Sequence, residues 1–174
     1  GLAYTAWDVQ NVTNMSKLFK DLSDFNGDIS DWNVSAVTDM SDMFAEAKSF
    51  NHDISNWNVG EVTNMKWMFY NAELFNQNLN LWNVTNVTDM SRMFAGAKSF
   101  NQNLNLWNVT NVTNMNKMFK DASTFNKNLA CWNITNVTNM NEIFNMSILS
   151  DLIKLGKKFP KIYLLSRTNI SVDN

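Results

Sequence analysis

The sequence predicts an α/β repeat solenoid with one short parallel strand and one short helix in every 25-residue unit. The first observation behind this prediction is a row of tryptophans spaced 25 residues apart without insertion or deletion: Trp7, Trp32, Trp57, Trp82, Trp107 and Trp132. A fixed period of this size is the signature of a stacked repeat array. The other two observations are the period-2 and period-3.6 patterns of apolar residues inside each unit.

Residues 54–78 contain both patterns. Trp57 and Val59 are two residues apart with asparagines beside them, which predicts a short half-buried strand. Four residues then follow the spacing of one helical face: Met65, Met68, Phe69 and Ala72. Thr63 or Asn64 precedes them as a candidate N-cap. We expect each strand to pair with the strand of the next unit in one long parallel sheet, because a single unit cannot bury its own edges.

A Phe-Asn pair recurs in each unit at a predicted turn. Its asparagines are Asn26, Asn51, Asn76, Asn101 and Asn126. Asparagine side chains bond to nearby backbone groups in turns, and identical side chains stacked at a fixed repeat form ladders. We therefore predict a structural ladder of asparagines along the array, in preference to a row of ligand-binding amides.

Two regions divide the chain. Residues 1–145 form about six 25-residue repeats, and residues 146–174 leave the pattern. This last region has helical spacing from Ile148 to Leu155, then Gly156, and a short apolar run from Ile162 to Leu165. We interpret it as a C-terminal cap, a helix with a possible last strand, that shields the final face of the core.

Composition excludes several classes of protein. Hydrophobic residues make up 45% of the 174-residue chain, too many for a disordered tract, and the net charge of −2 does not favour nucleic-acid binding. Cys131 is the only cysteine, so an intrachain disulfide is excluded. No apolar run is long enough to span a membrane. The chain begins with Gly1, from which we expect a mature or excised fragment.

The run from Trp82 to Asn101, WNVTNVTDMSRMFAGAKSFN, resembles a bacterial surface-protein repeat of about 26 residues, known also as a mycoplasma lipoprotein-associated domain of unknown function. The pattern of Ile54, Trp57, Val59 and Val62 is more distantly similar to the Treponema-type leucine-rich repeat. The resemblance covers roughly residues 4–145. It implies a right-handed, leucine-rich-repeat-like superhelix on a cell surface or secreted, with adhesion or host interaction as its role. Attachment to the envelope stays open, because no leader or anchor is recognised.

Positions that vary between repeats are the candidates for a binding site. Trp67 replaces charged residues of the other repeats, and Tyr70 lies three residues further on the same predicted helical face, with Lys66 beside them. An exposed Trp/Tyr pair is typical of a contact hot spot. The alternative interpretation is that the pair covers a neighbouring helix or makes a dimer contact.

The predicted strand face is the second candidate. Leu81 and Leu106 form an apolar patch there, and Asn83 and Asn108 form the adjacent row. By analogy with leucine-rich repeats, this is the concave binding face. The alternative is a passive surface, because isolated exposed apolar residues are common.

The sequence favours an interaction module over an enzyme. No arrangement of Ser, His and Asp, of Cys and His, or of a phosphate-binding loop can be built, so we predict no catalytic residue, cofactor or metal. The expected partner is a host protein or glycan bound through the strand face or the Trp67/Tyr70 patch. A structural spacer in a larger surface protein is the alternative, and ice binding by threonine rows is a remote one. The oligomeric state stays open.

Overall fold

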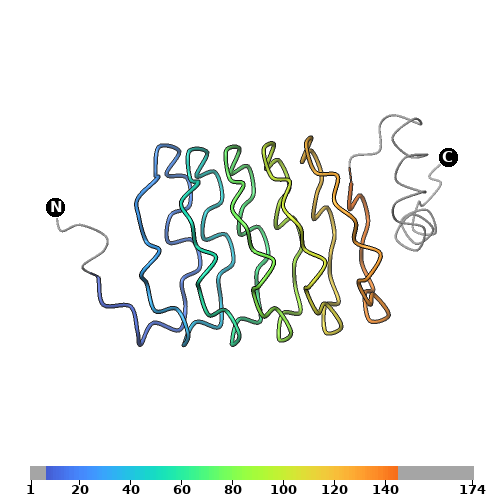
Figure 1. The fold of residues 1–174 in the computed structure, drawn as a ribbon, viewed down its shortest axis with the longest axis horizontal. Coiled ribbons are helices and arrows are strands. Elements are labelled where there is room, and N and C mark those ends of the chain that lie inside the picture. The colour runs from blue at the N-terminus through green and yellow to red at the C-terminus, as the bar shows by residue number, and fades with distance from the viewer. Residues whose placement is uncertain (1–6, 145–174) are drawn as a thin grey trace.

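The computed structural model describes residues 7–144, and the predicted C-terminal cap lies outside the described residues. Over this range the chain winds as a series of coils that lie side by side from the N-terminal to the C-terminal end (Figure 1). We number the coils from each tryptophan of the 25-residue row. The first coil is residues 7–31, the third 57–81, the fourth 82–106, and the sixth is described only over 132–144.

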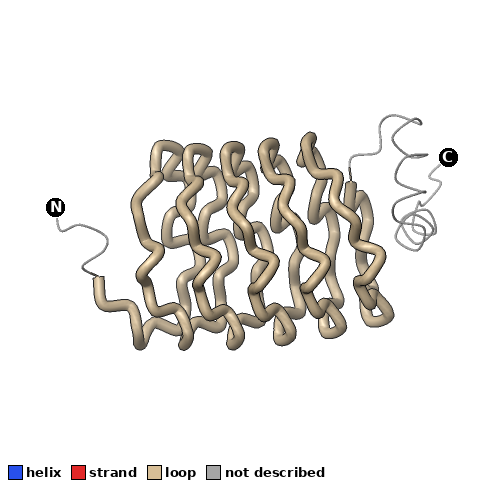
Figure 2. Tube along the Cα trace, in the orientation of Figure 1, coloured by secondary structure: helices blue, strands red, loops and turns tan. Residues whose placement is uncertain are grey.

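The coils are built from turns and not from helices and strands (Figure 2). Between residues 7 and 144 no helix forms, and parallel pairing is confined to isolated single-residue bridges. Five of these bridges join one row of residues: Asn14, Asp39, Asn64, Asp89, Asn114 and Asn139. The predicted α/β, leucine-rich-repeat-like fold with one strand and one helix per unit is therefore wrong. The coil-by-coil repetition on which that prediction rested is present.

The predicted helix of the third coil is a run of overlapping β-turns. The N–H of Met68 donates to the carbonyl of Met65 (3.3 Å) and the N–H of Ala72 to that of Phe69 (3.1 Å). The third residue of each of these turns, Trp67 or Asn71, has positive φ (59° and 52°). Positive φ at that position alone is the geometry of a type II turn. The same two positions have positive φ in the other coils, so the turns belong to the repeat itself.

Every second N–H group of this segment bonds to the next coil, and this is why a helix cannot form. Met65, Trp67, Phe69 and Asn71 donate to the carbonyls of Asp89, Ser91, Met93 and Ala95, at 2.8–3.0 Å. A helix needs those donors for its own i−4 carbonyls. Every second peptide unit of the segment therefore lies along the axis of the stack, with its N–H toward the C-terminal end. We call this segment the turn strip.

The predicted strand around Trp57 and Val59 is also two turns. The N–H of Trp57 donates to the carbonyl of Ile54 (3.1 Å), and the N–H of Val62 to that of Val59 (3.0 Å). Here a side chain joins successive repeats, because the indole Nε1 of Trp82 donates at 3.1 Å to the carbonyl of Ile54, which lies three residues before Trp57. The tryptophans thus mark the packing of each 25-residue repeat on the one before it.

The predicted asparagine ladder is confirmed. The Oδ1 of Asn51 accepts the N–H of Asn76 at 2.9 Å, and Asn76 does the same for Asn101. Elsewhere asparagine and aspartate stabilise turns inside a coil. The Oδ1 of Asn64, for example, accepts the N–H of Lys66, two residues on, at 3.2 Å. Asn64 is therefore the start of a turn, and not the predicted helix cap.

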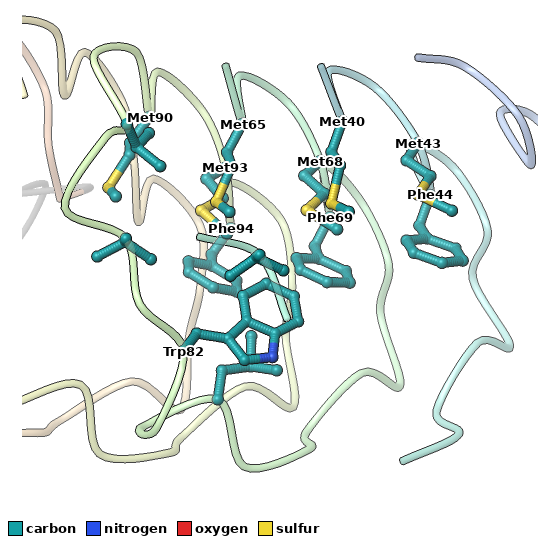
Figure 3. Close-up of a cluster of buried hydrophobic side chains, with 14 of the residues drawn as sticks. Met40, Met43, Phe44, Met65, Met68, Phe69, Trp82, Met90, Met93 and Phe94 are labelled. Carbon is teal, nitrogen blue, oxygen red and sulfur yellow. The ribbon is translucent and has the colours of Figure 1, made fainter. Parts of the chain in front are cut away.

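Apolar side chains form columns that run through the coils (Figure 3). The rings of Phe44, Phe69 and Phe94 stack at 5.5 and 5.6 Å between centroids, tilted by 5° or less. Inside the third coil, Phe69 also stacks on Phe75 at 4.0 Å. These phenylalanines are fully buried. Because the same residues repeat at one spacing, each coil packs on the coil before it and the coil after it through equivalent side chains.

Candidate functional site

Trp67 and Tyr70 lie together in the turn strip of the third coil. The N–H of Tyr70 donates to the Trp67 carbonyl at 3.0 Å, and the two ring centroids are 4.5 Å apart. Both side chains are half-buried, and the neighbouring Lys66 is exposed. The sequence correctly placed the two aromatic residues beside each other, but a β-turn and not a helical face brings them together.

Arg92 of the fourth coil covers the Trp67 ring. Its guanidinium carbon is 4.4 Å from the ring centroid, within the range of a cation–π contact. Part of the Trp67 surface is therefore used inside the molecule. The row that contains Trp67 is also not exposed throughout, because Asp42 is only 8% exposed and pairs with Lys20 at 2.8 Å. Charged residues at this position in the other coils favour exposure to solvent, but Asp42 is buried.

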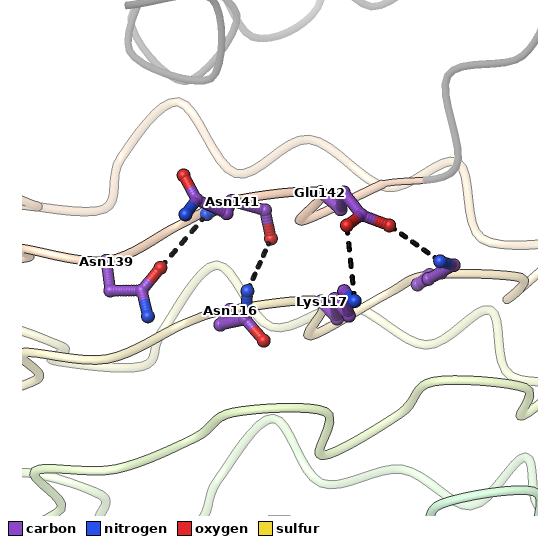
Figure 4. Close-up of polar contacts among 6 residues, drawn as sticks. Asn116, Lys117, Asn139, Asn141 and Glu142 are labelled. Carbon is purple, nitrogen blue, oxygen red and sulfur yellow. Dashed lines mark hydrogen bonds and ion pairs between the residues drawn. The ribbon is translucent and has the colours of Figure 1, made fainter. Parts of the chain in front are cut away.

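The same row ends in an ion-pair cluster around Glu142 (Figure 4). Its carboxylate contacts the Nζ atoms of Lys117 at 3.2 Å and Lys120 at 2.6 Å. The hydrogen bond from Lys120, followed by that from Lys117, lowers the pKa of Glu142 below its ordinary value of 4.5. Opposite charges therefore connect adjacent coils at this edge.

The second candidate surface contains the most exposed large apolar side chains of residues 7–144. Leu81 is 79% exposed and Leu106 is 62% exposed. Asn83 and Asn108, next in the sequence beyond the buried tryptophans, are also exposed. The two leucines occupy the same position in successive coils, so they form a short apolar row. The surface lies on turns and not on the predicted strand face.

This surface has a further feature, which the prediction of individual site residues did not include. The motif Asn-Val-Thr-Asn-Val-Thr occupies residues 83–88 and 108–113, and Asn-Ile-Thr-Asn-Val-Thr occupies 133–138. Its donors point into the stack: Asn111 Nδ2 donates to the Thr85 carbonyl at 2.8 Å, and Thr113 Oγ1 to the Thr88 carbonyl at 3.2 Å. Three successive coils thus carry the same uncharged polar side chains in fixed positions. The repeated Asn-x-Thr spacing in the sequence was sufficient to indicate this row of polar side chains.

Neither candidate surface has the groups of a metal centre. Within residues 7–144, no three His, Cys, Asp or Glu side chains come together in a way that could hold a metal ion. The same part of the chain contains no helix of sufficient length and apolar character to cross a membrane. Cys131 is exposed.

A family model matches the repeats of this chain. The model of the family described as "Mycoplasma protein of unknown function, DUF285" matches residues 2–89 and again residues 77–152. The chain belongs to the DUF285 family. The resemblance to a mycoplasma family of unknown function is thereby confirmed, whereas the DUF285 match lends no support to the leucine-rich-repeat similarity. No curated protein and no solved structure matches this DUF285 chain.

Proposed function

We propose that this DUF285 chain is a non-enzymatic interaction module, on a cell surface or secreted, that binds a host or envelope macromolecule through one side of its coils. The observation that carries the proposal is the exposed leucine pair, Leu81 and Leu106, beside the rows of Asn83 and Asn108. The backbone of each coil is bonded to its neighbours, so these side chains stand at fixed spacing. Binding to such a preorganised surface loses little conformational entropy in this chain.

The composition of the surface favours a neutral, repetitive partner. The three Asn-x-Thr-Asn-x-Thr coils carry no charge in that motif, and their amide and hydroxyl donors are partly used inside the stack. The Oδ1 atoms of Asn83 and Asn108 accept the N–H groups of Thr85 and Thr110 at 3.2 Å inside their own turns. The Nδ2 donors of these two asparagines and the leucine side chains therefore remain for contact. A glycan or an extended protein segment, each with hydroxyl or carbonyl acceptors and apolar faces, fits this combination. The Trp67/Tyr70 pair is a second contact candidate, reduced in area by Arg92.

The test compares binding of the whole chain with that of surface variants on a glycan array and in pull-down from host extracts. Leu81→Asp with Leu106→Asp is expected to abolish binding, because buried interface leucines cannot be replaced by a charge. Leu74→Asp is the matched control, since Leu74 is 55% exposed at a different position of the coil. Binding that resists the double change but is lost in Trp67→Ala would move the site to the turn strip. The absence of any binder would refute the proposal.

A structural spacer is the second candidate function. It is favoured by the axial hydrogen bonds, which join every described coil to the next. A rod of this kind holds another domain at a set distance without any partner of its own. An anchor and a different terminal domain in the full gene product, together with silent surface variants, would support the spacer.

A further inference from the structure

Coils four to six each carry two consecutive Asn-x-Thr triplets, and every such triplet is an acceptor sequence for N-linked glycosylation. The first triplet begins directly after the buried tryptophan, and we call its asparagines the first asparagines: Asn83, Asn108 and Asn133. The second triplet follows at once and contains the second asparagines: Asn86, Asn111 and Asn136. All six are exposed as whole residues, so exposure does not distinguish the two sets. The hydrogen bonds of their side chains distinguish them.

The first asparagines are held by their side-chain oxygen. The Oδ1 of Asn108 accepts both the N–H and the hydroxyl of Thr110, at 3.2 and 2.7 Å. Asn133 has the same two bonds with Thr135, at 3.2 and 2.6 Å. Because the oxygen points into the turn, the Nδ2 atom points away from it. Within residues 7–144, no hydrogen bond engages the Nδ2 of any of the three first asparagines.

The second asparagines are held by their side-chain nitrogen. Their Nδ2 atoms donate to backbone carbonyls of the preceding coil, which belong to Gly60 for Asn86, Thr85 for Asn111 and Thr110 for Asn136, at 2.7, 2.8 and 2.7 Å. The threonine hydroxyl of the second triplet also faces the preceding coil, since Thr138 Oγ1 donates to the Thr113 carbonyl at 3.1 Å. A sugar donor can therefore reach the Nδ2 of a second asparagine only if its amide rotates out of a bond between coils.

We propose that the first asparagines are sites of N-linked glycosylation on the folded chain, and that the second asparagines are not. The substrate is a sugar activated as a diphosphate ester. A bond forms between Nδ2 and C1 of the sugar, the bond from C1 to the diphosphate oxygen breaks, and the diphosphate leaves with the electron pair. Nδ2 gives up one of its two protons to solvent and keeps the other. Asn33 of the second coil belongs with the first asparagines, because its Oδ1 accepts the N–H and the hydroxyl of Ser35 at 3.2 and 2.7 Å.

Glycosylation also changes the surface proposed above for binding. Asn83 and Asn108 each stand two residues after an exposed leucine, Leu81 or Leu106. A sugar on Nδ2 would cover this apolar row and occupy the amide nitrogen beside it. A glycosylated chain is therefore expected to lose binding through this surface. That consequence rests on the proposed function, whereas the difference between first and second asparagines stands without it.

The test is the transfer of glucose to the folded full chain by a soluble N-glucosyltransferase, with uridine diphosphate glucose as the donor. Mass spectrometry of peptides then locates each modified asparagine. In coils four to six we expect hexose on the first asparagines in about tenfold excess over the second, because a second asparagine must first break its bond to the preceding coil. The control is the same chain digested to peptides before the transferase is added. Without the fold, both asparagines of each pair are expected to accept hexose at similar rates.

Two matched triple variants give a second measurement. Replacement of the three first asparagines by glutamine is expected to remove the hexose from coils four to six, whereas the same replacement of the three second asparagines is expected to leave it. Melting temperatures verify that both variants fold. Equal modification of first and second asparagines in the folded chain overturns the proposal, and so does a folded chain that accepts no hexose. Binding that persists after glucosylation contradicts the leucine surface as the contact, without touching the assignment of the modified asparagines.

Discussion

Gly96 offers the sharpest test of the turn strip, because it occupies one of the positive-φ positions (φ 73°). A Cβ at Gly96 would lie 1.9 Å from the Oδ1 of Asn71, whose Nδ2 bonds to Glu46 at 2.7 Å. In Gly96→Ala the left-handed backbone costs about 1–2 kcal/mol. Displacing the Asn71 amide costs about 0.5–1.5 kcal/mol more. We expect a total loss of roughly 1.5–3.5 kcal/mol in the free energy of unfolding.

The assay is urea denaturation of a double-mutant cycle. Asn71→Gly removes the side chain that the new Cβ meets, so Gly96→Ala in that background should cost only the backbone part, about 1–2 kcal/mol. Equal costs in both backgrounds would show that the close approach of Asn71 is irrelevant. No cost in either background would refute the assignment of positive φ to this position.

Three further predictions concern the columns, the ladder and the ion pairs. Phe94→Ala should destabilise the chain by about 3–5 kcal/mol in denaturant titration, because it empties a fully buried place between two stacked rings. Asn76→Ala should cost about 1 kcal/mol by the same measurement, since the N–H of Asn101 loses its acceptor. The lysines lower the pKa of Glu142 below 4.5, so its ionised form stabilises the fold at neutral pH and this contribution is lost as the pH falls below that value. Melting curves of Glu142→Gln should therefore lie below those of the parent at pH 7 and converge with them in acid; a constant gap would contradict the pairing.

The sequence was sufficient to predict the repetition and the asparagine ladder, because each depends only on residues recurring at one period. The tryptophans of the row are buried from Trp32 to Trp132, but Trp7 in the first coil is 43% exposed. The helix and the strand that the sequence predicted in each unit are absent from residues 7–144. Residues 65, 68, 69 and 72 have helical spacing, yet the ends of the turns 65–68 and 69–72 fall on the same positions. Apolar periodicity cannot separate the two, since both bury i and i+3. The acceptors of the alternate N–H groups decide between a helix and a run of turns. These acceptors lie in the next coil, so the choice depends on contacts between coils.

The candidate surfaces were predicted unevenly for a related reason. The exposure of Leu81 and Leu106 followed from their place beside a buried tryptophan. The cover that Arg92 gives to Trp67 required knowledge that residues 25 apart stand next to each other. Several asparagines and aspartates that begin turns stand two residues before Ser or Thr, as Asn83 does before Thr85. This spacing indicates turns more directly than any apolar pattern does.

The repetition has a consequence for how the length of this chain can change. The stretch FNQNLNLWNVTNVT occurs without difference at residues 75–88 and 100–113. Loss or gain of one 25-residue segment between them would leave the sequence around the new junction unchanged. Every column of apolar side chains and every asparagine ladder would therefore continue across the junction. A segment of any other size would shift all of them out of step at once. Stepwise growth and shortening are thus neutral to the fold, and the reach of the molecule is free to vary in whole coils.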